Sequence, residues 1–229
     1  MSPLLPDIQH TSPLGSAYSL DFDFPISKDT KEWFQKNRKP HTYIVCVSLS
    51  VGRRNTIDSS FEELESSLPE SFYVIIVGNH NLQSKESSKM KITGPEYFET
   101  LFPLCDAVYH QGGAGSTFIA MLSGKPQLFQ NSKGTVGFDK RVNKKSCIAM
   151  GITPTYAYVG ENVKFSRDIW LKMRDDIELQ KNCERIREKA LAEHGLQKIT
   201  NIILDNVRNL RRNNVRAVGG TRASRIFYL

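Results

Sequence analysis

Apolar residues follow two alternating patterns along this chain. Short runs of β-branched and aromatic residues have the unbroken apolar character of strands that are buried on both faces of a parallel sheet. The segments between them repeat apolar residues every three or four positions, as helices with one buried side do. The predicted strands are Thr42–Ser50, Phe72–Gly78, Asp106–His110 and Pro126–Gln130, with Tyr156–Val159 as a weaker candidate. The predicted helices are Lys28–Asn37, a segment that opens at Ser59 or Ser60, Glu96–Cys105, Ser116–Gly124, Phe138–Gly151, Ser166–Glu193 and Gln197–Arg212, and 79–91 is expected to be a polar loop.

Strands that alternate with helices predict an α/β fold with a Rossmann-like parallel sheet flanked by helices. A chain of 229 residues can bury one sizeable core. Residues 1–39 hold four prolines and little periodicity, which is typical of an extended lead-in. The predicted organisation is therefore a linker-like lead-in at 1–39, a Rossmann-like domain at 40–212 and a basic tail at 213–229.

Targeting and cysteine patterns indicate a cytoplasmic protein. No apolar run is long enough to span a bilayer, and the first residues lack the basic and apolar regions of a signal peptide. Cys46, Cys105, Cys147 and Cys183 form no CxxC pair, which argues against a zinc site and against a disulfide framework. Cys46 and Cys105 lie in apolar surroundings and are expected in the core.

The placement of the net charge of +7 matters more than its size. After Asp205 the chain has no acidic residue. The arginines in this segment are Arg208, Arg211, Arg212, Arg216, Arg222 and Arg225. A solvated helix face and tail is the simplest interpretation, and a weak contact with an anionic membrane surface is the alternative. No aromatic residue lies between these arginines, so nucleic acid is not an expected partner.

The segment HQGGAGST, 110–117, joins a predicted strand to a predicted helix. Ligands of open α/β sheets bind beyond the carboxyl ends of strands, and a helix N-terminus attracts anions. The glycines let the backbone approach a phosphate closely, Ser116 and Thr117 add hydroxyl groups, and His110 adds an imidazole at the mouth. A plain glycine-rich turn with Ser116 or Thr117 as helix cap is the alternative. The spacing fits neither a Walker A loop nor a dinucleotide-binding fingerprint.

The longer stretch LFPLCDAVYHQGGAGSTFIAMLSGKP, 101–126, resembles the donor-binding signature of the family 1 glycosyltransferases with the GT-B fold. The sterol and antibiotic UDP-glycosyltransferases are the most similar type. This resemblance extends from about Gly15 to about Leu210, strongly at Tyr97–Pro126 and weakly elsewhere. It implies that the chain is the C-terminal, nucleotide-sugar-binding half of a GT-B fold.

The resemblance also implies a set of donor contacts, and it implies that no metal is needed. The glycine-rich turn would cradle the diphosphate, a serine after the first strand would contact phosphate, the turn 94–98 would hold the uracil, and the start of the helix at 138–151 would hold the sugar. The implied donor-binding residues are His110, Gly112, Gly113, Ala114, Gly115, Ser116, Thr117, Ser48, Ser50, Tyr97, Phe98, Asp139 and Lys140.

Three positions depart from the pattern of that family. Gln111 replaces a second histidine, a glycine after the first strand is missing or shifted to Gly52, and Lys140 stands where a sugar-reading glutamine is expected. A lysine there suggests an altered or acidic sugar, a rearranged loop or a loss of transfer activity. A helix cap for Asp139 and a solvated side chain for Lys140 are the structural alternatives.

The acceptor half of such an enzyme, with its catalytic base, has no counterpart in this sequence, and no catalytic residue is assigned. The predicted function is therefore binding of a nucleotide-sugar, expected to be a UDP-sugar, by the donor half of a hexosyltransferase that is inactive alone. An N-terminal acceptor-binding domain or subunit is the expected partner, and a lipid, a sterol or a small molecule is the expected acceptor. A non-catalytic interaction module and another nucleotide-sugar enzyme, such as an epimerase, remain alternatives.

Overall fold

The computed structural model describes residues 25–48, 58–78, 87–130, 138–160, 162–192, 197–198 and 200–209. Only the backbone is described at 58–62 and at Phe138. The predicted site residue Ser50, most of the lead-in and the basic tail at 213–229 lie outside these ranges.

Five parallel strands form the central sheet in the order β3-β2-β1-β4-β5. They are β1 (Tyr43–Ser48), β2 (Phe72–Val77), β3 (Met90–Thr93), β4 (Ala107–His110) and β5 (Gln127–Phe129). All four pairings are parallel, which confirms the predicted Rossmann-like fold class. Strand β3 was not predicted, because its four residues lie at the end of a polar segment and carry little apolar pattern of their own.

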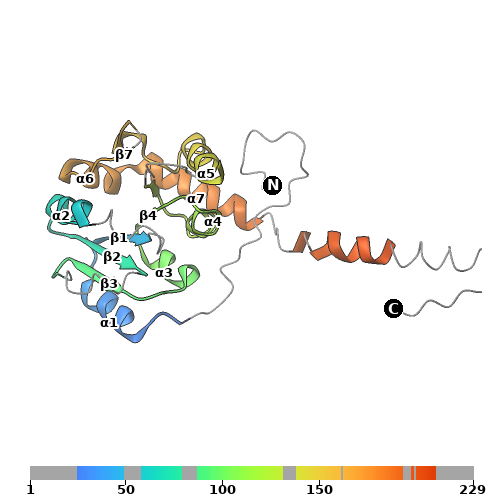
Figure 1. The fold of residues 1–229 in the computed structure, drawn as a ribbon, viewed down its shortest axis with the longest axis horizontal. Helices are drawn as coiled ribbons and strands as arrows, with labels where there is room; N and C mark the ends of the chain where they lie inside the picture. The colour runs from blue at the N-terminus through green and yellow to red at the C-terminus, as the bar shows by residue number, and fades with distance from the viewer. Residues whose placement is uncertain are drawn as a thin grey trace, which may run out of the picture.

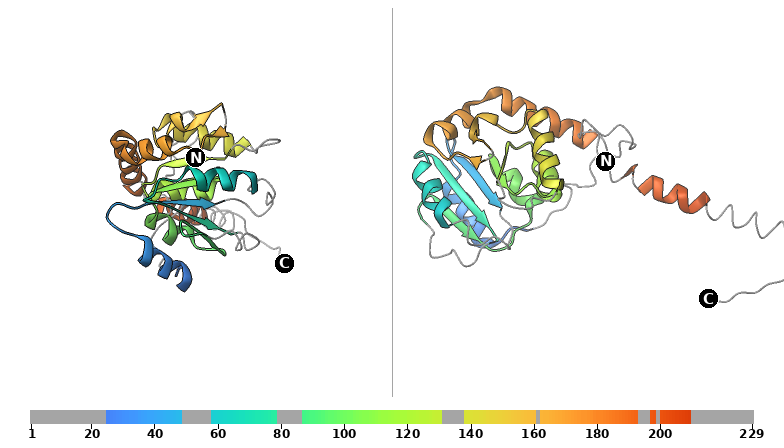
Figure 2. Two further views of the ribbon diagram at one scale, coloured as in Figure 1. Left: turned by 90° about the vertical axis from the view of Figure 1, so that its left-hand side faces the viewer. Right: turned by 45° about the horizontal axis from the view of Figure 1, so that its top comes forward.

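Helices cover both faces of this sheet (Figures 1 and 2). One face packs against α1 (Lys28–Asn37) and α3 (Phe98–Leu104), and the other against α2 (Asp58–Ser67), α6 (Arg167–Asp175) and α7 (Ile177–Ala192). Helix α4 (Ala114–Leu122) contributes residues to both apolar clusters, and α5 (Phe138–Ala149) contributes Cys147 to the larger one.

Successive residues of β1 point to opposite faces, so each strand serves two cores. Val45 and Val47 join the larger cluster, whose centre includes the fully buried Trp170. Ile44 and Cys46 join the smaller cluster, together with Cys105. The prediction that Cys46 and Cys105 are core residues is confirmed.

The C-terminal part of the domain differs from its prediction in two places. The weaker strand candidate does not extend the parallel sheet, because β6 (Tyr158–Val159) pairs antiparallel with β7 (Asn162–Val163). The single helix predicted at Ser166–Glu193 is two helices, separated at Asp176. The Asp176 carboxylate accepts hydrogen bonds from the Leu179 backbone N–H at 3.0 Å and from the Tyr156 hydroxyl at 3.0 Å, and a side chain that caps a new helix ends the preceding one.

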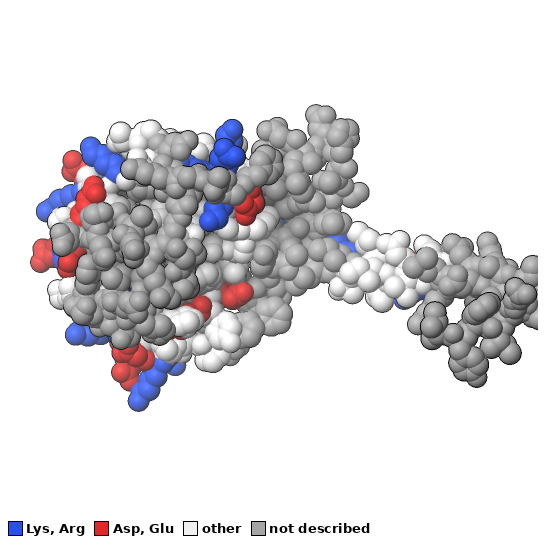
Figure 3. All heavy atoms as spheres, in the orientation of Figure 1, with Lys and Arg blue, Asp and Glu red and all other residues white. Residues whose placement is uncertain are grey.

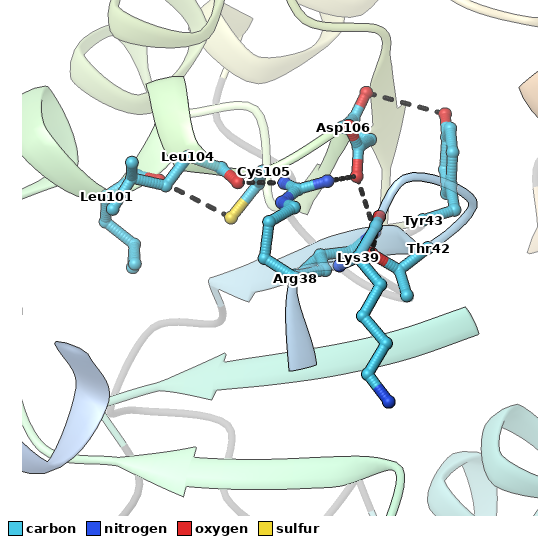
Figure 4. A network of polar contacts seen from close by, with 9 residues as sticks. Arg38, Lys39, Thr42, Tyr43, Leu101, Leu104, Cys105 and Asp106 are labelled. Carbon is cyan, nitrogen blue, oxygen red and sulfur yellow. Dashed lines mark hydrogen bonds and ion pairs between the residues drawn. The ribbon is translucent and has the colours of Figure 1, made fainter. Parts of the chain in front are cut away.

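A network of hydrogen bonds stabilises the edge of the sheet at which β1 and β4 begin (Figure 4). Asp106 Oδ2 accepts hydrogen bonds from Arg38 Nη1 at 2.6 Å and from the Ile44 backbone N–H at 2.7 Å. Arg38 also donates to the Leu104 carbonyl. The network therefore joins the end of α1 to the end of α3 and to both central strands.

Residues 200–209 are helical and exposed, and they stand apart from the globular part in Figures 1 and 2. This helix carries apolar side chains that are 43–56% exposed: Ile202, Ile203, Leu204 and Val207. On the globular part, the acidic and basic side chains drawn in Figure 3 are intermixed. Among the described helices, none is long and apolar enough to cross a bilayer.

Candidate functional site

The carboxyl ends of the three strands nearest the glycine-rich turn lie together at one edge of the sheet. Ser48 is the last residue of β1 and pairs in register with His110, the last residue of β4. His110 in turn pairs with Phe129, the last residue of β5. In open α/β sheets this edge is where ligands bind.

The turn between β4 and α4 is built on Gly112 and Gly113. Gly112 has φ +84°, a backbone angle that favours glycine, and a Cβ atom there would be crowded at 3.0 Å from Phe129 Cδ1. Gly113 is the N-cap of α4, and no side chain caps this helix end. The helix begins at Ala114, two residues earlier than predicted.

The first turn of α4 has backbone donors without acceptors inside the helix. The first helical hydrogen bond runs from the Thr117 N–H to the Gly113 carbonyl at 3.0 Å. The N–H groups of Ala114, Gly115 and Ser116 therefore point out of the helix end, where the partial positive charge of the helix is greatest. This is the arrangement that binds phosphate groups in proteins.

His110 does not lie open at the mouth of this turn, and that part of the prediction is wrong. Its side chain is fully buried and packs against the Phe129 ring, with the two ring centroids 4.7 Å apart. Its Nδ1 accepts a hydrogen bond from the Gly112 backbone N–H at 3.0 Å, so the proton is on Nε2, which donates to Gln127 Oε1 at 2.9 Å. Both ring nitrogens are occupied inside the protein, so the imidazole positions the turn.

Burial lowers the pKa of His110 from 6.5 to about 4, although the hydrogen bond with Gln127 opposes this shift. The imidazole is therefore neutral at pH 7. A neutral ring can accept from Gly112 and donate to Gln127 at the same time, whereas an imidazolium can only donate. The geometry of the turn thus depends on the uncharged form.

The hydrogen-bond chain continues from Gln127 into α4. Gln127 is fully buried, and its Nε2 donates to the Thr117 carbonyl at 3.2 Å. The Thr117 hydroxyl donates to the Gly113 carbonyl at 2.8 Å. Because a hydroxyl has one proton, Thr117 is not the free donor that the sequence suggested. Turn, helix and two strands are joined by this single chain of contacts.

Helix α5 packs against the other side of the turn. The buried Asn143 Nδ2 donates to the Gly112 carbonyl at 2.8 Å. Lys140, in the first turn of α5, donates from Nζ to Gln111 Oε1 at 3.3 Å, and Asp139 beside it is exposed. Lys140 is half-buried and held at the turn, so it is not a freely solvated side chain.

Tyr97 and Phe98 lie at the start of α3 and differ from one another. Tyr97 is the N-cap of α3 and is 50% exposed. Phe98 stacks on Phe102 with ring centroids 4.6 Å apart and packs on the smaller core cluster. Of the two aromatic rings, Tyr97 is the one that a ligand can reach.

Glu96, one residue earlier, ties the turn before α3 to α1. It accepts hydrogen bonds from the side chains of Ser27 at 2.5 Å, Thr30 at 2.7 Å and Thr93 at 3.0 Å. Burial raises the pKa of Glu96, but these hydrogen bonds outweigh it, so the pKa is lowered overall. The ionised Glu96 carboxylate therefore holds the turn 94–98 against the start of α1.

Two amide groups next to the turn are incompletely satisfied. Gln111 Nε2 and Gln130 Oε1 are buried and have no hydrogen-bond partner among the described residues. Native proteins rarely leave such groups unpaired, and those that do deserve an explanation. No group of three His, Cys, Asp or Glu side chains that could hold a metal ion is found in the described ranges.

The sequence did not single out Gln127, Asn143 and Glu96, which build the site. Each is a polar residue inside a predicted strand or helix. Gln127 and Asn143 hold the glycine-rich turn through hydrogen bonds, and Glu96 holds the separate turn 94–98. A glutamine at the first position of a strand of three buried residues is the one signal that could have been noticed, since buried polar side chains need partners.

The solved structures most similar to this chain include several glycosyltransferases. The glycosyltransferase VinC in complex with dTDP superposes with a TM-score of 0.67 at 15% identity, over 90% of this chain and 51% of that chain. The spinosyn rhamnosyltransferase SpnG complexed with spinosyn aglycone gives 0.64 at 16% identity, over 87% and 54%. SnogD from Streptomyces nogalater gives 0.59 at 15% identity, over 88% and 52%.

No protein-family model and no curated protein matches the sequence. The chain spans about half the length of each of these solved structures. The matched part is the C-terminal half of GT-B glycosyltransferases of family 1, of the antibiotic and macrolide type. The protein therefore has the fold of that C-terminal half, as its sequence predicted.

Proposed function

We propose that this chain is the nucleotide-sugar-binding half of a glycosyltransferase. It binds a UDP-sugar at the carboxyl edge of the sheet, without a metal ion, and a hexose passes to a lipid, sterol or small-molecule acceptor. The acceptor site and the catalytic base belong to an N-terminal domain or a separate subunit.

One observation carries the proposal: the N-terminus of α4 is uncapped and directly follows a parallel strand at this edge. Three outward N–H groups and the helix dipole would bind the diphosphate. In the transfer step, negative charge develops on the departing diphosphate. Fixed N–H donors stabilise such charge without reorganising, which is how this helix end would promote the reaction.

The similarity to about half of each two-domain enzyme supports the proposal that the acceptor site lies in another domain or subunit. The exposed apolar side chains at 200–209 would give an acceptor-binding partner a surface to contact, because exposed apolar surface is unfavourable in water. The arginines that follow this helix in the sequence would add weak attraction to an anionic membrane surface.

The proposal is tested by titrating UDP into the chain in a calorimeter, with and without EDTA. We expect binding that EDTA leaves unchanged. The backbone at Gly113 is extended and no atom lies within 4 Å of a Cβ there, so the site accepts other residues. Gly113→Asp places a carboxylate where the diphosphate would bind.

Asp is a favoured N-cap residue, so Gly113→Asp should keep or raise the thermal midpoint while UDP affinity falls by about a hundredfold. Gly113→Asn, its uncharged counterpart, should cap the helix as well but weaken UDP binding less. If UDP bound both variants and the wild type equally, the diphosphate would not sit at α4.

A further inference from the structure

Lys140 lies in a position that is unfavourable for a cation in the absence of a ligand. It is in the first turn of α5, next to the exposed Asp139, where the partial charge of the helix end is positive and acidic residues are preferred. Across the described residues, no carboxylate lies within ion-pair distance of its Nζ. The ammonium group instead donates to the neutral Gln111 Oε1 at 3.3 Å. An anion close to Nζ would remove this electrostatic cost.

The contact with Lys140 also fixes the orientation of Gln111. An ammonium group can only donate, so the amide oxygen of Gln111 faces Lys140 and the amide nitrogen faces away. That nitrogen is the buried donor that has no partner among the described residues, and Gln130 Oε1 is an acceptor in the same condition. One cation, one neutral donor and one neutral acceptor thus flank the carboxyl ends of β4 and β5. A ligand that carries both hydroxyl groups and an anionic group could pair with all three.

The sheet order places these groups at one end of the proposed donor. Along the carboxyl edge, the strands follow one another as β3, β2, β1, β4 and β5. If the diphosphate binds at α4, after β4, a nucleoside that reaches the turn before α3 extends toward β3. The sugar then extends the other way, toward β5 and the first turn of α5, where Lys140 lies.

We propose that Lys140, oriented by Gln111, selects a nucleotide-sugar whose sugar carries a carboxylate, such as a uronic acid. This inference rests on the proposed function and narrows its substrate class. The Lys140 ammonium would bind the sugar carboxylate in a charge-assisted hydrogen bond, and the two unpaired amide groups would bind sugar hydroxyls.

The test compares UDP, UDP-glucose and UDP-glucuronate in calorimetric titrations of three proteins. They are the wild type, Lys140→Gln, and the control Lys145→Gln, which removes an exposed lysine of the same helix. The wild type should bind UDP-glucuronate about tenfold more tightly than UDP-glucose. Lys140→Gln should abolish that preference and leave the affinity for UDP, which has no sugar, within about twofold, whereas the control should behave like the wild type.

The outcomes separate this inference from the proposed function. If UDP fails to bind the wild type, both are overturned. If UDP binds but the two sugars bind equally, the proposed function stands and the acidic-sugar inference is wrong. A comparable loss of UDP and UDP-glucose affinity in Lys140→Gln would also overturn it, because the lysine would then contact the diphosphate. A tryptophan fluorescence melt of each variant checks that the substitutions leave the fold intact.

Discussion

The two edges of the central sheet are built in opposite ways. At the edge where the strands begin, Asp106 accepts from Arg38 and from the Ile44 backbone, and these contacts tie two helices to two strands (Figure 4). At the edge where the strands end, α4 has no capping side chain, and Gln111 and Gln130 each keep an unpaired buried amide atom in the described structure.

The contacts that stabilise the fold and the groups available to bind a ligand thus lie at opposite edges of the same sheet. Buried polar groups are normally satisfied, and the network around Asp106 obeys that rule. Of the three unsatisfied side-chain groups in the described structure, those of Gln111 and Gln130 lie at the opposite edge and Thr153 Oγ1 is the third. The turn beside Gln111 and Gln130 is nevertheless held rigidly by His110, Gln127 and Asn143. A rigid turn with spare hydrogen-bonding capacity is preorganised for a ligand, because the ligand need not order it.

The largest expected effect comes from His110→Ala. It removes the acceptor for Gly112 and the donor for Gln127, and it leaves a cavity beside Phe129. We expect a loss of about 3 kcal/mol in unfolding free energy, measured by urea denaturation, and weaker binding of UDP and of uridine together. A variant of normal stability that lost UDP binding alone would show that His110 contacts the diphosphate after all.

Asp106→Ala should have the next largest effect, and on stability alone. It leaves the Ile44 N–H and the Arg38 guanidinium without their shared acceptor, which should cost about 2 kcal/mol of unfolding free energy. Because the site lies at the other edge, the UDP affinity of the folded protein should be unchanged. A matched drop in UDP affinity would mean that the two edges are coupled.

Acidification should produce the smallest effect, through the neutral His110. Its pKa is lowered from 6.5 to about 4 in the folded protein, so the unfolded chain binds more protons between these values. Stability is therefore complete above pH 6.5 and falls as the pH falls toward 4, by about 1 kcal/mol between pH 7 and pH 5.5. Denaturation curves at the two pH values should differ less for His110→Gln, which lacks the titrating group.

Glu96 does not interfere with that measurement. Its pKa is lowered by its hydrogen bonds despite burial, so its contribution to stability is lost only at pH values below the ordinary glutamate range. A wild-type protein whose stability did not change between pH 7 and 5.5 would show that His110 is not buried in its neutral form.

The sequence predicted the sheet and the turn well because their signals are local. Apolar runs such as Phe72–Val77 need no tertiary context to be read as buried strands, and glycines between a strand and a helix are specific to such turns. Strand β3 was missed because pairing with β2, and not its own pattern, makes it a strand. The same applies to the break at Asp176, where one side chain that caps a helix overrides a continuous helical pattern.

The role of His110 could not be read from the sequence for a different reason. A histidine at a strand end can point toward a ligand or into the core, and the choice depends on whether a partner such as Gln127 lies opposite. That partner is seventeen residues away and becomes adjacent only when β4 and β5 pair. The sequence can therefore predict a strand or a helix correctly and still mispredict the orientation of a single side chain at its end.

The central place of β1 has a consequence for how the chain acquires its fold during synthesis. Strand β1 pairs with β2 on one side, but its other side pairs with β4, so that Val45 meets Ala107 only after two more strands and two helices have been made. At about 5–20 residues per second, a ribosome needs several seconds to produce that interval. During this time the growing chain exposes an apolar strand edge of the kind that aggregates. Early folding of this domain should therefore depend on chaperones more than a fold built from sequential hairpins would.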